Sequence, residues 1–142
     1  MTTATRAPAT RPRTTAELSL RSGPYPLDRL DALIESGISL FLDLTEVGEL
    51  QSYTQLLGKR ARHVRAAISD FGVPREDEMA RALDVIDDAL AHGETVYVHC
   101  RAGVGRTRTV IGCHGKRHGT DAGPSPETAE QRRFVRSWPA GR

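Results

Sequence analysis

Residues 95–109, TVYVHCRAGVGRTRT, constrain the fold of this chain more than any other segment. The first five are apolar and rich in β-branched residues, which predicts a short buried strand. A loop with Gly103 and Gly105 follows, and residues 107–113 are compatible with a helix. A strand, a glycine-bearing loop and a helix start together form a cradle for an anion, because backbone N–H groups turn inward and the helix dipole favours negative charge. The two glycines permit positive φ angles and close approach of the backbone.

Cys100 lies at the start of this loop. The positive potential that would bind a phosphate also stabilises a thiolate, so we expect Cys100 to be a nucleophile beside a bound phosphoryl group. The planar guanidinium of Arg106 can pair two phosphate oxygens. Thr107 can donate a hydrogen bond to the sulfur and assist its departure as a leaving group. A buried structural cysteine at a strand end is the alternative interpretation.

The order His99-Cys100, five residues, Arg106-Thr107 resembles the HCxxGxxR[ST] motif of cysteine-dependent protein tyrosine phosphatases. The surrounding sequence is most similar to the compact dual-specificity group, of a bacterial type, over about residues 23–119, with weaker traces in residues 125–138. The resemblance implies catalysis without a metal or an organic cofactor, with His99 ordering the loop. It implies that phosphate is bound by the loop residues Arg101, Ala102, Gly103, Val104, Gly105 and Arg106.

Asp70 is the candidate general acid. It lies in residues 68–74, ISDFGVP, whose Gly and Pro predict a loop. Loops that follow parallel strands emerge at one edge of an α/β sheet, where ligands bind, so Asp70 and Cys100 can meet although 30 residues separate them. The family has its general acid in such a loop before Val-Pro, and the resemblance therefore assigns this role to Asp70. A turn residue without chemistry is the alternative.

The alternation of elements predicts an α/β fold in one domain, with a mainly parallel central sheet flanked by helices. Residues 43–46, DLTE, are interpreted as a turn that helps to seat the phosphate loop. Apolar periodicity predicts helices over residues 27–35, 51–57 and 74–92 and strands over residues 39–44 and 63–67.

Composition bounds the remaining possibilities. The 142 residues suffice for one domain with a core, placed at residues 21–138. Residues 1–20 are rich in Thr, Ala, Pro and Arg, which predicts a disordered tail; a transit peptide is disfavoured because the tail lacks an amphipathic period. A net charge of +2 and the lack of a long apolar run give no case for nucleic acid or membrane binding. Two cysteines favour a reducing compartment, so we expect a cytoplasmic protein. We also expect it to be a monomer.

The sequence after Cys113 departs from the family pattern. Glycines at 112 and 115 each cost about 1 kcal/mol in a helix interior relative to alanine, so the helix behind the loop is expected to be shortened. The C-terminal part is also expected to be shortened, because the brief loop over residues 119–124 leaves no room for the additional helix that family members usually have there. Arg108 stands where the family has a small residue; whether it crowds the helix or attracts phosphate stays open. His114 and His118 have a spacing that can bind a metal, but no third ligand is evident, and we expect a partly solvated helix end. Residues 125–127, SPE, predict the start of a last helix over residues 128–138.

The leading hypothesis is a protein tyrosine or dual-specificity phosphatase that works through a cysteinyl-phosphate on a phosphorylated protein or a small phosphoester. The loop lacks the lysine often found in phosphoinositide phosphatases, which disfavours inositol lipids. One alternative is a catalytically impaired phosphate-binding module, favoured by the altered helix and by Arg108. The other is a rhodanese-like sulfur transferase, although the common rhodanese loop has four residues between Cys and Arg and this chain has five.

Overall fold

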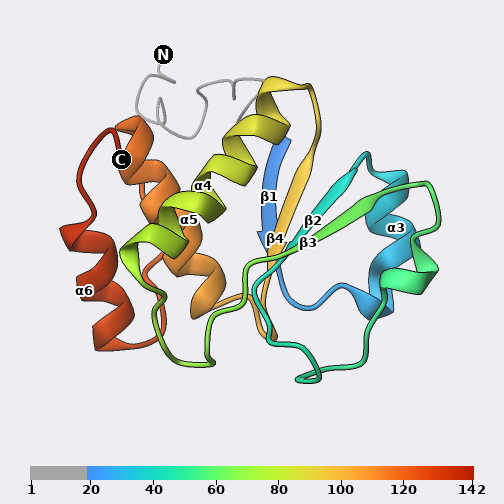
Figure 1. Ribbon diagram of the computed structural model, residues 1–142, viewed down its shortest axis with the longest axis horizontal. Coiled ribbons are helices and arrows are strands. Elements are labelled where there is room, and N and C mark those ends of the chain that lie inside the picture. Colours follow the sequence, from blue (N-terminus) through green and yellow to red (C-terminus); the bar gives the residue numbers. More distant parts are fainter. Residues whose placement is uncertain (1–18) are drawn as a thin grey trace, which may run out of the picture.

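Four parallel strands form the centre of the computed structural model, which describes residues 19–142 (Figure 1). The sheet order is β1-β4-β2-β3, so β4 and β2 lie in the middle and are buried throughout. The predicted parallel sheet and three of its strands are confirmed. In chain order the strands are β1 (Leu20–Gly23), β2 (Leu40–Asp43), β3 (Arg62–Arg65) and β4 (Val96–His99).

Strand β1 was not predicted. Residues 1–18 of the predicted tail lie outside the described residues, but Leu20, which the prediction assigned to the tail, pairs with Val96 as the first residue of β1. The tail boundary at residue 20 was therefore wrong. The sequence of this strand, LRSG, shows little apolar pattern because an edge strand with a partly exposed surface does not need one.

Helices cover both faces of the sheet (Figure 1). Alternate residues of the central strands point to opposite faces, so Leu40 and Leu42 join one apolar cluster with the α4, α5 and α6 side, whereas Phe41 joins a second cluster with the α3 side. The α3 side carries η2 (Leu27–Arg29), α3 (Leu30–Glu35) and η3 (Thr54–Leu56), and the other side carries α4 (Glu76–Ala91), α5 (Arg106–His118) and α6 (Ala129–Ser137).

Helix α4 matches its prediction closely. Acidic residues fill its first turn, where they complement the helix dipole, and the Arg75 amide donates to Glu78 Oε1 at 2.9 Å. The predicted apolar stripe packs into the core, with Met79, Leu83 and Ile86 fully buried. Each such side chain contributes about 1.5–3 kcal/mol on burial. This stripe fixes α4 over the sheet and thereby the loop that precedes it.

Helix α5 is longer than predicted. Its two glycines lie where neighbouring segments pack closely against the helix. A Cβ on Gly112 would lie 2.8 Å from Val135 Cγ1 of α6. A Cβ on Gly115 would collide with the carbonyl oxygen of Asp121. Any larger residue would push α6 and the connecting loop away from α5. The expectation that glycines shorten the helix behind the loop was therefore wrong.

Helix α6 begins later than the Ser-Pro-Glu pattern predicts. Thr128 is its N-cap: the Gln131 amide donates to Thr128 Oγ1 at 3.1 Å, and the Thr128 amide donates to Gln131 Oε1 at 3.1 Å. This reciprocal capping box satisfies two backbone donors and sets the start of the helix. Val135 and Trp138 pack against the core.

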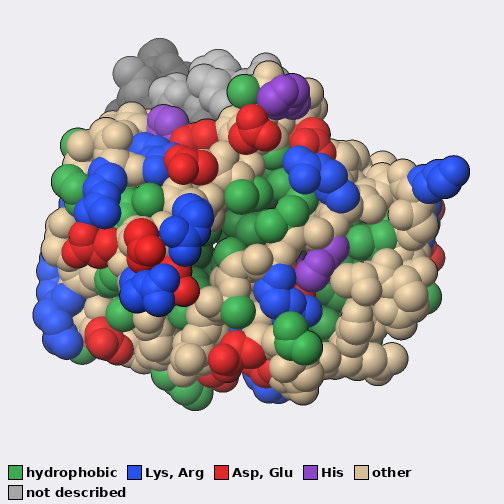
Figure 2. Space-filling view, in the orientation of Figure 1, with side chains coloured by type: hydrophobic (Ala, Val, Ile, Leu, Met, Phe, Trp, Pro, Cys, Tyr) green, Lys and Arg blue, Asp and Glu red, His purple; other side chains and the backbone are tan. Residues whose placement is uncertain are grey.

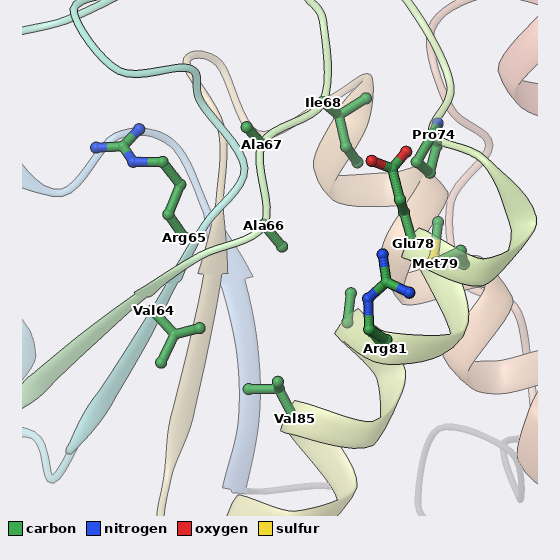
Figure 3. A pocket seen from close by; sticks show the side chains of 11 residues that line it. Val64, Arg65, Ala66, Ala67, Ile68, Pro74, Glu78, Met79, Arg81 and Val85 are labelled. Carbon is green, nitrogen blue, oxygen red and sulfur yellow. The ribbon is translucent and has the colours of Figure 1, made fainter.

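A hollow with a volume of about 320 Å³ lies between β3 and α4 (Figure 3). Apolar side chains including Val64, Met79 and Val85 line it, with Glu78 and Arg81 beside them. The space-filling view shows apolar side chains in the middle of this face with charged ones around them (Figure 2). No residue of the 100–107 segment lines this hollow. Among residues 19–142, none of the helices combines the length and the apolar character needed to cross a membrane.

Candidate active site

The loop of residues 100–105 joins the end of β4 to the start of α5 at the carboxyl edge of the sheet, as the sequence predicts. Gly103 has φ 82° and lies so close to the neighbouring segment that a Cβ would be 2.6 Å from the carbonyl carbon of Gly23. Gly105 has an ordinary φ of −85°, so it does not use the positive φ that a glycine permits. A Cβ there would lie 3.0 Å from Glu127 Oε1, so a side chain at this position would require Glu127 to move by a few tenths of an ångström.

The sulfur of Cys100 accepts two hydrogen bonds. Thr107 Oγ1 donates to it at 2.9 Å and the Gly103 amide donates at 3.3 Å. A thiolate accepts such bonds more strongly than a thiol does. Cys100 and Thr107 are both buried, so these donors keep their positions relative to the sulfur.

Arg106 is the largest fully buried side chain of the described residues. Its Nη1 and Nη2 donate to the two carboxylate oxygens of Glu49 at 2.9 and 2.8 Å, and Nη1 also donates to the Ile68 carbonyl at 2.9 Å. Burial lowers the pKa of Arg106, but the hydrogen bonds and charge of Glu49 outweigh it and the net shift is upward. The hydrogen bonds from Arg106 lower the pKa of Glu49 to about 2, against the effect of burial. The pair is therefore fully ionised at neutral pH.

Glu49 was missed by the sequence analysis. It lies 57 residues before Arg106, in the loop after β2, and no motif or spacing marks it. The only signal is topological: the carboxyl end of β2 borders the end of β4, so the loop after β2 borders the phosphate loop.

Asp70 lies beside Arg106, with its Oδ1 3.3 Å from Arg106 Nη2. The Phe71 amide donates to the same oxygen at 3.0 Å. Phe71 has φ 65° and a side chain that is 58% exposed. The loops after β3 and β4 thus meet, as the topology argument predicts. A pocket of about 90 Å³ lies between them, and its lining residues are Asp70, Phe71, Cys100, Arg101, Ala102, Gly105, Arg106 and Glu127.

Four of the predicted phosphate-binding residues, Arg101, Ala102, Gly105 and Arg106, line this pocket, whereas Gly103 and Val104 of the same loop do not. The Tyr25 amide donates to the Arg101 carbonyl at 3.0 Å and so holds the loop to the segment after β1. Glu127, another residue that the sequence analysis missed, adds a carboxylate to the pocket from the segment before α6.

His99 lies beneath the loop and is fully buried. Its Nε2 is 2.6 Å from the Tyr53 hydroxyl and its Nδ1 is 3.4 Å from the Cys100 carbonyl oxygen. Burial lowers the pKa of His99 to about 4, although the nearby charge of Asp43 opposes that shift. The ring is therefore neutral at pH 7, and its contacts are those of a residue that orders the loop.

Asp43 ends β2 and forms the turn that the sequence predicts at residues 43–46. Its Oδ1 accepts hydrogen bonds from the Thr45 amide at 2.9 Å and from Thr45 Oγ1 at 2.6 Å, and its Oδ2 lies 2.9 Å from His63 Nε2. Burial raises the pKa of Asp43, but the hydrogen bonds of His63 and Thr45 reverse this and lower it to about 2. Leu44, which follows Asp43, donates its amide hydrogen bond to the His99 carbonyl at 3.0 Å. The buried Asp43 carboxylate therefore orders the turn that contacts the base of the phosphate loop.

Arg108 contacts the segment before α6. Its Nη1 donates to the Ser125 carbonyl at 3.3 Å, and its side chain does not belong to the pocket lining. The half-buried arginine therefore ties the first turn of α5 to the segment before α6.

Comparison with known proteins adds a family match over most of the chain. A family model described as "Polymorphic toxin system, DSP-PTPase phosphatase" matches residues 21–120. Protein 067L of Invertebrate iridescent virus 3, named as a tyrosine phosphatase, is 35% identical over 98 residues, which are 64% of this chain and 40% of that protein. Phosphatidylglycerophosphate phosphatase PTPMT1 of Arabidopsis thaliana is 30% identical over 116 residues, which are 80% of this chain and 33% of that protein. This chain thus spans less than half the length of either relative.

A solved structure shows the same fold. Tk-PTP in its active form superposes with a TM-score of 0.76 at 22% identity, over 84% of this chain and 90% of that chain. At this level of identity the likeness concerns the fold, with its parallel sheet and flanking helices.

Proposed function

Because this chain belongs to the DSP-PTPase phosphatase family of polymorphic toxin systems, we propose that it hydrolyses phosphomonoesters with Cys100 as the nucleophile. The resemblance of its loop to that of compact cysteine-dependent phosphatases is confirmed by this membership. The observation that carries the assignment of Cys100 is the hydrogen bond that Thr107 donates to its sulfur at 2.9 Å, at the base of a pocket that Arg106 also lines. That arrangement suits a nucleophile that must later leave.

Arg106 would hold the phosphate. Its buried Nε has no hydrogen-bond partner among residues 19–142, and buried donors are rarely left without one. A phosphate oxygen in the pocket would supply the missing acceptor. Glu49 holds both Nη atoms of the guanidinium, so the group is oriented before the substrate arrives and loses little freedom on binding.

The reaction follows in two steps. The Cys100 thiolate attacks phosphorus, the bond from phosphorus to the ester oxygen breaks, and protonated Asp70 gives its proton to the leaving oxygen. Asp70, now a carboxylate, then takes a proton from water, whose oxygen attacks phosphorus. The S–P bond breaks, which releases inorganic phosphate and restores the thiolate. Charge on the transferred group is stabilised by Arg106 in both steps.

Phosphotyrosine is the substrate class that this pocket fits best. Phe71 stands exposed at the pocket, where it can contact an aromatic ring. The plant relative's name specifies phosphatidylglycerophosphate, a lipid phosphate without inositol, whereas the missing lysine in the loop of this chain disfavours inositol lipids only. The family description names toxin systems, so we place the phosphorylated proteins in a target cell. A reducing compartment such as the cytoplasm would keep the Cys100 thiol available for the reaction.

Hydrolysis of para-nitrophenyl phosphate by the purified protein tests the activity, in a chelating buffer and after a cooperative melt is seen. Turnover establishes a metal-independent phosphatase. Rates on phosphotyrosine peptide, phosphoserine peptide and phosphatidylglycerophosphate then rank the substrate classes, and we expect the first to be fastest. A folded protein that binds phosphopeptide without turnover would favour the impaired phosphate-binding module. Two observations support the active enzyme over that alternative: Gly112 and Gly115 lie at positions of close packing, and Arg108 donates a hydrogen bond to the Ser125 carbonyl.

A further inference from the structure

A cluster of three metal-ligand side chains lies between α4 and α5. Asp87 comes from α4, and His114 and His118 come from α5. Asp87 Oδ1 is 2.8 Å from His114 Nε2 and 2.9 Å from His118 Nε2. One ligand atom from each of the three residues lies within 4.8 Å of the others. The proposed phosphatase reaction uses none of these residues.

We propose that Asp87, His114 and His118 form a binding site for a divalent transition metal ion, with Zn²⁺ as the best fit. Two imidazole nitrogens and one carboxylate oxygen are a ligand set that Zn²⁺ accepts. The i, i+4 spacing places both histidines on one face of α5, and their ring centroids are 4.5 Å apart. The third ligand, which the sequence does not reveal, comes from a position 27 residues before His114.

Two of the three ligand separations need only a small adjustment, and the separation between the two Nε2 atoms is within 4.8 Å. With bonds of about 2.0–2.1 Å to a tetrahedral Zn²⁺, neighbouring ligand atoms lie roughly 3.3 Å apart. The two N–O separations of 2.8 and 2.9 Å must therefore open by a few tenths of an ångström. Each imidazole would carry its proton on Nδ1 and turn the lone pair of Nε2 to the metal.

The charges around the cluster leave one carboxylate oxygen for the metal. Arg117 Nη1 lies 3.1 Å from Asp87 Oδ2 and 2.9 Å from Asp84 Oδ1. Arg117 thus binds the second oxygen of Asp87, which also lies 3.0 Å from His118 Nε2, while Asp84 balances the positive charge of Arg117. The His118 side chain is 44% exposed, so water can reach the fourth coordination position.

A metal at this site would link the two helices that follow the catalytic loops. Helix α5 begins at Arg106, and His114 lies eight residues further on, about 12 Å along the helix. Helix α4 follows the loop of Asp70. The ion is therefore expected to stabilise the α4–α5 pair without entering the chemistry at Cys100.

Metal titration of untagged protein tests the site. The Cys100→Ser variant is the background, because a free thiolate at the loop would also bind soft metals. After treatment with a chelator, Zn²⁺ is titrated against a chromophoric competitor and Co²⁺ is followed by its visible absorption. We expect 1:1 binding of both ions, a tetrahedral Co²⁺ spectrum, and a rise in Tm of at least about 5 °C with saturating Zn²⁺.

His118→Gln decides the outcome, because its half-exposed side chain can be replaced without unfolding the protein. We expect it to weaken Zn²⁺ binding by more than about 100-fold, beyond the loss caused by an outer-shell partner. His92→Gln is the matched control, since His92 is an exposed histidine at the end of α4 that faces Asp88. Equal affinity in the two variants, or no 1:1 binding in the Cys100→Ser background, would overturn the proposal.

Discussion

The two cysteines of this chain are both buried and free, yet their surroundings differ completely. Cys100 accepts hydrogen bonds from Thr107 and from the loop backbone and shares a pocket with Arg106. Cys113 lies in the middle of α5 within the apolar core cluster, where burial raises the pKa of its thiol to about 12. The comparison teaches that burial alone makes a cysteine inert, and that donors aimed at the sulfur are what prepare a nucleophile.

Replacing each cysteine in turn gives the largest expected difference. Cys100→Ser should reduce kcat on para-nitrophenyl phosphate by at least about 10⁴-fold, because the hydroxyl is a far weaker nucleophile. Cys113→Ala should leave kcat within about threefold while it lowers stability by about 1–2 kcal/mol through a small core cavity. Steady-state kinetics and urea unfolding of both variants measure this contrast. Comparable activity in the two variants would contradict the assignment of Cys100.

Asp70→Asn tests whether the polar surroundings of Cys100 include a proton donor. With phenyl phosphate, a poor leaving group, kcat should fall by about 10²–10⁴-fold, because the amide cannot protonate the leaving oxygen. With a leaving group as acidic as dinitrophenol, the loss should be much smaller, and this substrate serves as the internal control. Equal losses on both substrates would assign Asp70 a role in binding instead.

Sequence reasoning recovered those parts of the molecule whose signals are local. The segment from β4 to α5 has a strand, two glycines and a helix start in one stretch, and α4 has an uninterrupted apolar period and an acidic first turn. Asp70 could be placed near Cys100 because parallel strands send their following loops to the same edge. Local pattern and topology together were sufficient to predict that Asp70, Cys100 and Arg106 lie close together, and the structure has all three at one pocket.

The remaining features depend on contacts between segments far apart in the chain. Glu49 is marked only by its bonds to Arg106, and β1 only by pairing with β4. Gly112 was interpreted as a helix defect because propensity is a property of an isolated helix, whereas its reason is the approach of α6. Asp87 likewise gains its meaning from two histidines of another helix.

Removing the carboxylate that holds Arg106 should have an intermediate effect. Glu49→Gln leaves a buried guanidinium without its partner, so we expect KM to rise about tenfold and the free energy of unfolding to fall by up to about 3 kcal/mol. Because the pKa of Glu49 is lowered to about 2 from 4.5, its stabilisation is complete above pH 4.5 and is lost as the pH falls toward 2. The variant should therefore show a flatter acid limb in urea unfolding.

Glu46→Gln is the control for Glu49, because Glu46 is an exposed residue of the same loop. It should change neither KM nor the acid limb. If Glu49→Gln behaved like this control, the ion pair with Arg106 would contribute nothing to stability or binding, and the remaining contacts of the guanidinium with the Ile68 carbonyl and Asp70 would hold it in place.

The smallest expected effect is on the pH dependence of stability, and it differs between the buried His99, beneath Cys100, and an exposed histidine. The pKa of His99 is lowered to about 4 from 6.5 by burial. Between these values the unfolded chain binds a proton that the folded protein refuses, so stability falls as the pH drops through this window. One pKa unit corresponds to about 1.4 kcal/mol, and we expect His99 to account for up to about 2 kcal/mol of the loss between pH 6.5 and 5.

Urea unfolding at pH 6.5 and 5 should show that His99→Gln reduces this loss. His92→Gln should act in the opposite direction, because a hydrogen bond to the Asp88 carbonyl raises the pKa of His92. A histidine with a raised pKa stabilises the fold below its unfolded pKa of 6.5, and this stability disappears as the pH rises through the folded pKa. Removing His92 should thus deepen the loss toward pH 5. If His99→Gln left the loss unchanged, the ring would accept a proton in the folded protein, and the floor of the loop would tolerate a charge that its burial argues against.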